Sequence, residues 1–213
     1  MLIMSTQNYT YLHRKLLSWY KTHGRQLPWR ETDDPYKILV SEIMLQQTQV
    51  SRVIDKYNSF IHHFPDVYSL AKSSTGKIIR EWSGMGYNKR AVNLHKTAKI
   101  IVQNHNGEIP KLLDTLVSLP GIGRYTASAV ANFAFRLRVP VVDINIKRVI
   151  GRVDQGSLFD TNKLAWGAAL KYLPEKTKTG DWHQALMDLG AMVCTARKPS
   201  CESCPLVLNC SAS

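Results

Sequence analysis

Hydrophobic residues recur along the chain mostly at the three- and four-residue spacing of an α-helix. In residues 9–22, for example, Leu12, Leu16 and Trp19 fall on one side of a helical projection. Further helices are predicted to start near residues 35, 50, 66, 74, 88, 112, 125, 145, 161 and 181. Only the run 139–143 is β-like, and it is too short and isolated to imply a sheet. The pattern therefore predicts an all-α protein.

One stretch, Leu119–Arg148, combines features that point to a binding site. Gly121 and Gly123 bracket an isoleucine in a tight turn, and a helix of small residues follows at once. Amides at such a helix start, together with the positive end of the helix dipole, favour an anion such as a DNA phosphate. A plain corner between two helices is the alternative interpretation. The presence of Arg124, Tyr125 and Asp143 in the same stretch favours a functional interpretation of the turn.

Charge narrows the class of partner. The chain has 28 Lys and Arg against 16 Asp and Glu, a net charge of +12 and a pI of about 9.6. This excess favours a polyanion, nucleic acid ahead of an anionic membrane surface, over a protein that is merely basic. No run approaches the roughly 20 apolar residues of a membrane span. The first residues lack the features of a secretion signal, so we expect a cytoplasmic, nucleoid-associated protein.

All the cysteines lie near the carboxyl end, which favours one local ligand set in a reducing compartment over scattered disulfides. Only one Cys-x2-Cys pair is present, and the wider gaps suit an iron–sulfur cluster better than zinc, with a disulfide pair less favoured again. The four residues are Cys194, Cys201, Cys204 and Cys210. Arg197 and Lys198 lie within the first loop of this segment, where they could meet a phosphate or simply be solvated.

The motifs resemble those of a known family. LPGIGRYTASAVANFAF followed by VVDIN, with the C-x6-C-x2-C-x5-C spacing, resembles the helix-hairpin-helix DNA glycosylase superfamily that includes endonuclease III. LPWRETDDPYKILVSEIMLQQTQV, WSGMGYNKRAVNLHKTAKII and MDLGAMVCTARKPSCESCPL are similar to the MutY-type adenine glycosylase branch. The resemblance covers residues 10–210 and implies a two-lobed fold. A six-helix barrel would span residues 27–136, and a lobe holding a [4Fe–4S] cluster would comprise residues 1–26 and 137–213.

The resemblance also assigns roles around the scissile sugar–base bond. Asp143 matches the acid that faces the sugar and stabilises its developing positive charge, although a plain helix cap is the alternative. Asn145 matches a residue positioned beside that acid. Tyr125 stands where bifunctional relatives carry a lysine nucleophile. Since a Schiff base requires an amine, we expect base removal without cutting of the DNA backbone.

Adenine is a poor leaving group unless a ring nitrogen is protonated, so its excision calls for a buried acid. Glu42 lies in the apolar helix LVSEIMLQQ, where an acid is out of place unless it is used or paired. It matches the general acid of adenine glycosylases. A buried salt bridge with an arginine is the alternative role for Glu42.

A base within a duplex must be flipped out before it can be excised, and the gap must be filled. Gln46 and Gln47 match the polar pair that probes the vacated stack, and Tyr87 matches an aromatic wedge. A polar helix end and core packing, respectively, are the alternative interpretations of these residues.

These observations predict a monofunctional glycosylase that removes adenine opposite 8-oxoguanine or guanine, acting as a monomer on mispaired double-stranded DNA. MutY relatives continue into a carboxy-terminal domain that reads 8-oxoguanine, whereas this chain stops three residues after Cys210. That feature resembles the thymine-mismatch enzymes, so a glycosylase for T·G and U·G pairs is the alternative. A non-catalytic DNA-binding module is a third possibility.

Overall fold

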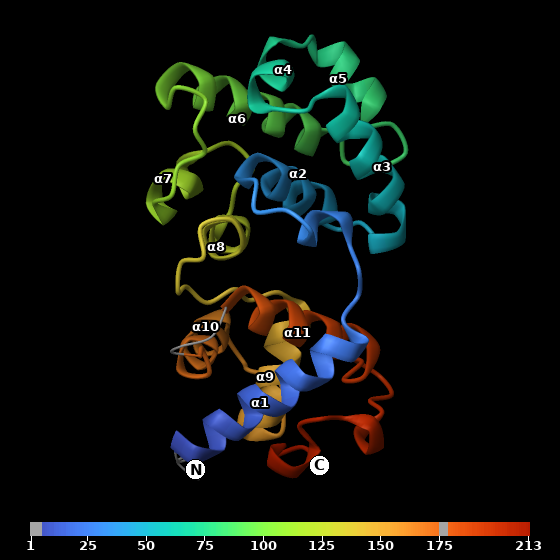
Figure 1. Cartoon of the computed structure of the whole chain (residues 1–213), viewed down its shortest axis with the longest axis vertical. Helices are drawn as coiled ribbons and strands as arrows, with labels where there is room; N and C mark the ends of the chain where they lie inside the picture. The colour runs from blue at the N-terminus through green and yellow to red at the C-terminus, as the bar shows by residue number, and fades with distance from the viewer. Residues whose placement is uncertain (1–5, 175–178) are drawn as a thin grey trace. The chain divides into compact units, whose positions relative to one another are not determined.

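The computed structural model describes residues 6–174 and 179–213. The chain divides into two compact units (Figure 1). One is Gln26–Phe135, and the other joins Met1–Arg25 to Arg136–Ser213. Every regular element within the described residues is a helix, as predicted. None of these helices is both long and apolar enough to cross a membrane.

The contiguous unit holds seven α-helices and a short 3-10 turn among its described residues. Their bounds are η1 (Pro28–Arg30), α2 (Pro35–Leu45), α3 (Val50–His63), α4 (Val67–Lys72), α5 (Thr75–Glu81), α6 (Lys89–Asn104), α7 (Leu113–Ser118) and α8 (Arg124–Phe133). The other unit contains α1 (Thr6–His23), α9 (Ile144–Gln155), α10 (Asn162–Lys171), α11 (Thr179–Met192), η2 (Cys201–Ser203) and η3 (Val207–Asn209).

Helix α2 forms the centre of the contiguous unit. Asp34 caps it by accepting hydrogen bonds from the amides of Tyr36 and Lys37, and Pro35 occupies its first turn. All residues from 36 to 44 except Lys37 are buried, because α3, α6 and α8 pack around the helix. Helix α8 is buried throughout residues 126–132, where alanines and other small side chains allow it to lie close against α2.

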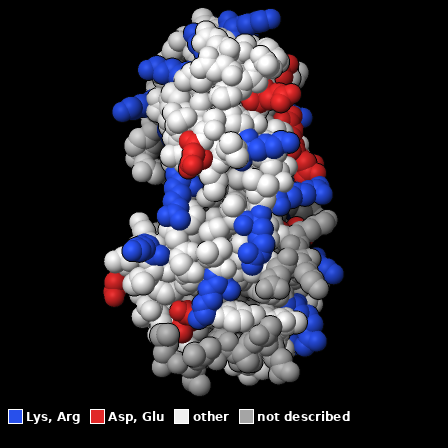
Figure 2. Space-filling model, turned by 90° about the vertical axis from the view of Figure 1, so that its left-hand side faces the viewer, with Lys and Arg blue, Asp and Glu red and all other residues white. Residues whose placement is uncertain are grey.

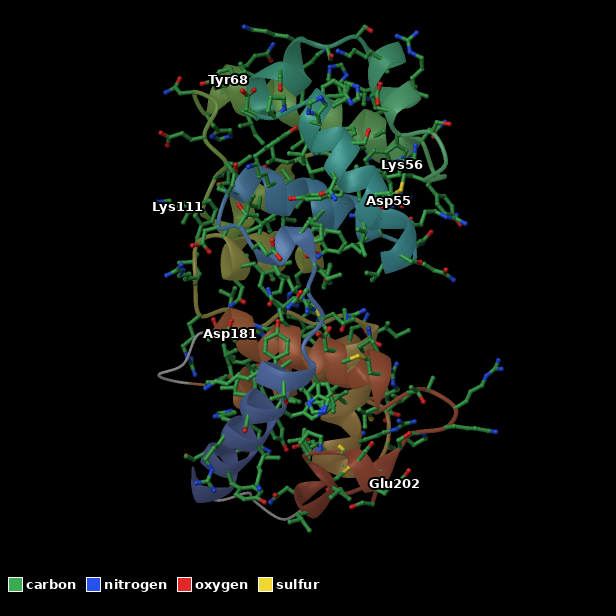
Figure 3. All side chains as sticks on the ribbon, turned by 45° about the vertical axis from the view of Figure 1, so that its right-hand side comes forward. Asp55, Lys56, Tyr68, Lys111, Asp181 and Glu202 are labelled. Carbon is green, nitrogen blue, oxygen red and sulfur yellow. The ribbon has the colours of Figure 1, made fainter. Side chains whose placement is uncertain are left out.

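Helix α4 packs along α6 on the outer side of this unit. The hydroxyl of Tyr68, labelled in Figure 3, donates a 2.6 Å hydrogen bond to the carbonyl of Asn106, just beyond the end of α6. This contact ties the start of α4 to the last turn of α6.

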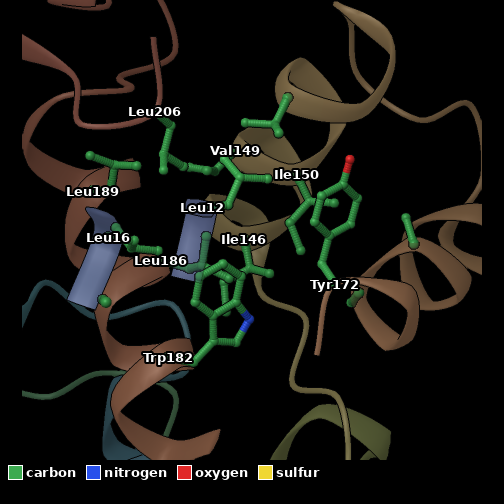
Figure 4. Packing of buried hydrophobic residues seen from close by; sticks show 14 of the residues in the cluster. Leu12, Leu16, Ile146, Val149, Ile150, Tyr172, Trp182, Leu186, Leu189 and Leu206 are labelled. Atoms are coloured by element: carbon green, nitrogen blue, oxygen red, sulfur yellow. The ribbon is translucent and has the colours of Figure 1, made fainter. Parts of the chain in front are cut away.

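The discontinuous unit has its own hydrophobic core (Figure 4). Leu12 and Leu16 of α1 meet Ile146 of α9 and Trp182 of α11, and each of these four side chains is at most 2% exposed. An ion pair lies just beyond the end of α1: the partly exposed Arg25 contacts the fully buried Asp188 of α11 at 2.6 Å. The two ends of the chain therefore share one core.

The β-like run 139–143 forms extended coil rather than a strand. Val141 is completely buried, and its amide donates a 3.0 Å hydrogen bond to Nε2 of His183 on α11. A histidine side chain thus takes the place of a neighbouring strand as hydrogen-bond acceptor. Burial accounts for the apolar residue at the centre of this segment, Val141.

Candidate functional site

Asp143 is the N-cap of α9, and it is held from two directions. Its Oδ1 atom accepts a 2.6 Å hydrogen bond from the amide of Ile146, and its Oδ2 atom accepts one of 2.9 Å from Nδ2 of Asn145. Asp143 therefore does cap the helix, as the alternative interpretation predicted. Capping does not exclude a catalytic role, because each carboxylate oxygen keeps a further lone pair.

The polar contacts continue from Asp143 towards the cysteine segment. Arg148 donates from Nη2 to the amide oxygen of Asn145 at 2.8 Å and from Nε to the carbonyl of Cys194 at 2.7 Å. Gly190 permits this arrangement, since a Cβ at that position would lie 2.6 Å from the Cβ of Asn145. The acid and the first cysteine are thus joined through two side chains.

Burial raises the pKa of Asp143 above the ordinary value of an aspartic acid. The hydrogen bonds from Ile146 and Asn145 and the positive charge of Arg148 act in the opposite direction, because they stabilise the carboxylate. Desolvation by burial is the largest of these effects, so the pKa of Asp143 is raised although the residue caps a helix.

Glu42 lies near the middle of α2 and is 5% exposed, among the apolar side chains that the sequence predicted. Gln46 follows it by four residues, so the two share one face of α2. The side-chain amide of Gln46 donates to Oγ1 of Thr126 at 3.3 Å. Thr126 adjoins the partly buried Tyr125 at the start of α8. The contiguous unit therefore brings the helix of Glu42 against the helix of Tyr125.

The two glycines of the hairpin turn differ in what they require. Gly121 has a φ of +79°, and a Cβ there would lie 2.9 Å from the Cβ of Asn93, so both backbone and packing demand glycine. Gly123 has a φ of −90°, which any residue adopts, and a Cβ there would contact nothing within 4 Å. Because Gly123 has no side chain, the backbone amides at the start of α8 are accessible to solvent beside the exposed Arg124.

The predicted DNA-probing residues lie on two exposed turns. Gln47 follows α2 with a φ of +55°, and Tyr87 precedes α6 with a φ of +48°. Tyr87 is 65% exposed, so core packing does not account for it. Gln46 is tied to the hairpin as well, since its side chain donates to the carbonyl of Gly121 at 3.4 Å.

The four cysteines lie in one segment and form no disulfide with one another, and Figure 3 labels Glu202 within this segment. Burial raises the pKa of Cys204 and Cys210, and the charges of the neighbouring cysteines raise them further. No three His, Cys, Asp or Glu side chains in the described part of the chain are placed to hold a single metal ion. The electrostatic interaction of Cys204 with the other three cysteines shows that the thiols lie near one another, and four cysteine thiolates are the usual ligand set of an iron–sulfur cluster.

The loop between the first two cysteines presents cations to solvent. Arg197 and Lys198 are exposed, and the hydroxyl of Thr195 closes the loop by donating to the carbonyl of Lys198 at 2.6 Å. Arg152 lies behind the segment and donates to Sγ of Cys194 at 3.3 Å. In the view of Figure 2, lysine and arginine side chains are dispersed over both units rather than gathered in one patch.

Sequence reasoning missed three residues that organise these sites: Arg90, Arg148 and His183. Arg148 carried a usable signal, because it follows Asn145 by three residues on the same helix and therefore lies on the same face. Arg90 and His183 act through contacts with residues far away in the sequence, which no local pattern reveals.

Comparison with known proteins assigns these features to a family. Residues 40–174 match the model described as HhH-GPD superfamily base excision DNA repair protein, and residues 194–207 match the iron–sulfur binding domain of endonuclease III. A protein of Mycobacterium tuberculosis called adenine DNA glycosylase is 45% identical over 90% of this chain. The chain spans 64% of the length of that relative.

Solved structures resemble the whole chain. A thermostable thymine-DNA glycosylase matches with a TM-score of 0.88 and 32% identity, over 97% of this chain and 96% of the other. A trapped covalent intermediate of endonuclease III with DNA matches with a TM-score of 0.81 and 23% identity, over 99% and 97% of the two chains. The second likeness, at that identity, is one of fold alone.

Proposed function

Because the chain belongs to the HhH-GPD superfamily of base excision DNA repair proteins, we propose that it is a monofunctional, mismatch-specific DNA glycosylase. It flips adenine out of a duplex opposite 8-oxoguanine or guanine and hydrolyses the N-glycosidic bond. The observation that carries the choice of adenine is the burial of Glu42 in α2, together with the likeness to a relative called adenine DNA glycosylase.

Bond cleavage leaves positive charge on the sugar and negative charge on the departing base. Asp143 faces the sugar, and its carboxylate stabilises the positive charge of the oxocarbenium-like sugar. Asn145 and the amide of Ile146 hold the carboxylate in place. Glu42 neutralises the negative charge of the departing base by protonating a ring nitrogen of adenine, since a buried carboxylic acid is a suitable proton donor. Water then completes the hydrolysis.

Tyr125 supports the monofunctional assignment. A phenol cannot form a Schiff base with the sugar, so the reaction ends at an abasic site and leaves the backbone uncut. Tyr125 is partly buried in the first turn of α8, which directly follows the hairpin turn of Gly121 and Gly123.

DNA binding in this proposal divides between phosphates and bases. The open amides at Gly123, the side chain of Arg124 and the loop of Arg197 and Lys198 contact phosphates. The turns that carry Gln46, Gln47 and Tyr87 enter the base stack. The four cysteine thiolates hold a [4Fe–4S] cluster, which supplies a rigid centre for the phosphate-contacting loop.

The alternative substrate is a thymine or uracil opposite guanine, favoured by one observation. The thymine-DNA glycosylase structure matches nearly the full length of both chains. Thymine and uracil leave as stabilised anions and need little protonation. That reaction would therefore tolerate the loss of Glu42, whereas adenine excision would not.

One experiment separates these functions. Purified protein is incubated with labelled duplexes containing A·8-oxoguanine, A·G, T·G or U·G, with and without hot alkali. The proposal expects strand breaks only after alkali and only in the adenine duplexes, and it expects Glu42→Gln and Asp143→Asn to abolish them. Cutting confined to T·G and U·G would establish the alternative. Breaks without alkali would refute the role given to Tyr125.

A further inference from the structure

We propose that Arg90 is a positioning residue that clamps the turns carrying Gln47 and Tyr87 into one rigid surface for unstacking DNA. The inference deepens the proposed function and rests on it for the DNA partner. It does not depend on which base is excised.

The guanidinium of Arg90, at the start of α6, lies between these two turns and donates to both. Its Nη1 atom reaches the backbone carbonyls of the α2 end, and its Nη2 atom reaches Thr48 and the turn before α6. The acceptors are the carbonyls of Ile43 (3.0 Å), Met44 (2.8 Å), Gln46 (2.5 Å), Met85 (3.0 Å) and Gly86 (3.2 Å) and Oγ1 of Thr48 (3.0 Å).

These acceptors explain why the position holds an arginine. The last carbonyls of a helix have no intrahelical donor, and those of Ile43 and Met44 at the end of α2 receive theirs from Arg90. The planar guanidinium presents donors in two directions at once, whereas a lysine offers one compact ammonium. Its central carbon also lies 5.4 Å from the ring centre of the buried Trp82, whose indole donates to the carbonyl of Gly86.

The same guanidinium holds the two strained points of the surface. Gln47 and Tyr87 both have a positive φ, which residues with a Cβ rarely adopt and which persists only where the surroundings enforce it. The carbonyls just before them belong to Gln46 and Gly86, and Arg90 donates to both. One side chain thus stabilises both unusual backbone conformations.

A clamp of this kind suits a surface that must enter a base stack. The Tyr87 ring is 65% exposed, and the Arg90 central carbon lies 5.6 Å from its centre. Inserting a wedge opposes stacking energy, and a turn that yields would lose the geometry needed for insertion. Arg90 therefore acts through Gln47 and Tyr87. Its two terminal nitrogens donate to protein acceptors, five carbonyls and the hydroxyl of Thr48.

The test measures unstacking directly and does not require excision. 2-Aminopurine, whose fluorescence rises when it unstacks, is placed opposite a tetrahydrofuran abasic analogue in a duplex. Binding of the holoprotein should raise its fluorescence, and Tyr87→Ala should abolish the rise. We expect Arg90→Lys, which keeps the charge, to lose most of the rise while DNA affinity by anisotropy changes less than about threefold. Lys96→Gln, at an exposed residue of the same helix, is the matched control.

A milder variant completes the design. Thr48→Val removes one acceptor and keeps the arginine, so a partial loss of the rise is expected. This variant decides the question if Arg90→Lys shows no cooperative thermal unfolding.

The outcomes separate this inference from the proposed function. Arg90-dependent unstacking in a protein that excises no adenine would support the clamp and refute the adenine assignment. Adenine excision with full unstacking in Arg90→Lys would overturn the clamp alone. Wild-type fluorescence in both Arg90→Lys and Thr48→Val would also overturn it.

Discussion

Protonation of one buried histidine should destabilise the unit that carries Asp143. His183 is 1% exposed, and its Nε2 atom accepts the amide hydrogen of Val141, two residues before Asp143. Burial lowers the pKa of His183 from 6.5 to about 4, and a hydrogen bond to the backbone of Thr179 opposes the shift only in part. The imidazole is therefore neutral in the folded protein, and a proton on Nε2 would remove the acceptor for Val141.

The direction and size of the change in the free energy of unfolding follow from the difference in proton binding between the folded and unfolded chain. Between pH 6.5 and about 4 the unfolded chain binds a proton at His183 that the folded chain does not. The stabilisation is complete above pH 6.5 and is lost as the pH falls through that window, in total about 3 kcal/mol. Between pH 7.5 and 5.0, the part due to His183 amounts to about 2 kcal/mol.

Urea titrations followed by circular dichroism at pH 7.5 and 5.0 measure this loss. His183→Gln supplies the comparison, because its amide oxygen can still accept a hydrogen bond and does not titrate. We expect the free energy of unfolding to fall by about 2 kcal/mol more in the wild type than in the variant. Equal losses in the two proteins would show that the pKa of His183 is the same in the folded and unfolded protein, and would refute the reasoning.

Outcomes are expected for four further substitutions. Asn145→Ala removes a hydrogen bond that lowers the pKa of Asp143, so the acid limb of the excision rate should move to higher pH, which a pH–rate profile would detect. Gly121→Ala should lower the free energy of unfolding by more than about 1 kcal/mol because of its positive φ. Gly123→Ala should leave stability unchanged and weaken DNA binding in anisotropy titrations, and equal effects of the two substitutions would contradict this assignment. Asp188→Ala removes a fully buried carboxylate that accepts from both the side chain and the backbone amide of Arg25 and should cost about 1–3 kcal/mol in chemical denaturation, whereas an unchanged free energy of unfolding would contradict it.

The helices could be predicted because their signals are local. Asp34 and Pro35 mark the start of α2 as a cap and a first-turn proline, and both are observed there. The apolar spacing of α1 likewise predicted the face that carries Leu12 and Leu16, which lies in the core. Such features depend on neighbours within a few residues, which the sequence presents directly.

The contacts that organise the sites could not be predicted because they join distant residues. Arg90 bonds to carbonyls more than forty positions away, and His183 bonds to Val141 across a similar separation. Gly123 looked equivalent to Gly121 in the motif, yet only the backbone of Gly121 is unusual. The run ending at Asp143 has the composition of a strand, yet the amide of its buried residue, Val141, pairs with a histidine side chain instead of a neighbouring strand.

The shared core of the two chain ends has a consequence for synthesis on the ribosome. Residues 26–135 form a compact unit by themselves and can fold as soon as they emerge. Helix α1 emerges first, but its partners Ile146 and Trp182 are translated more than a hundred residues later. The apolar face of α1, which carries Leu12 and Leu16, therefore remains exposed to chaperones and to neighbouring nascent chains until these partners have been made. The pairing of Arg25 with Asp188 can form only after α11 has been made, so α1 reaches its final contacts later than residues 26–135 can reach theirs.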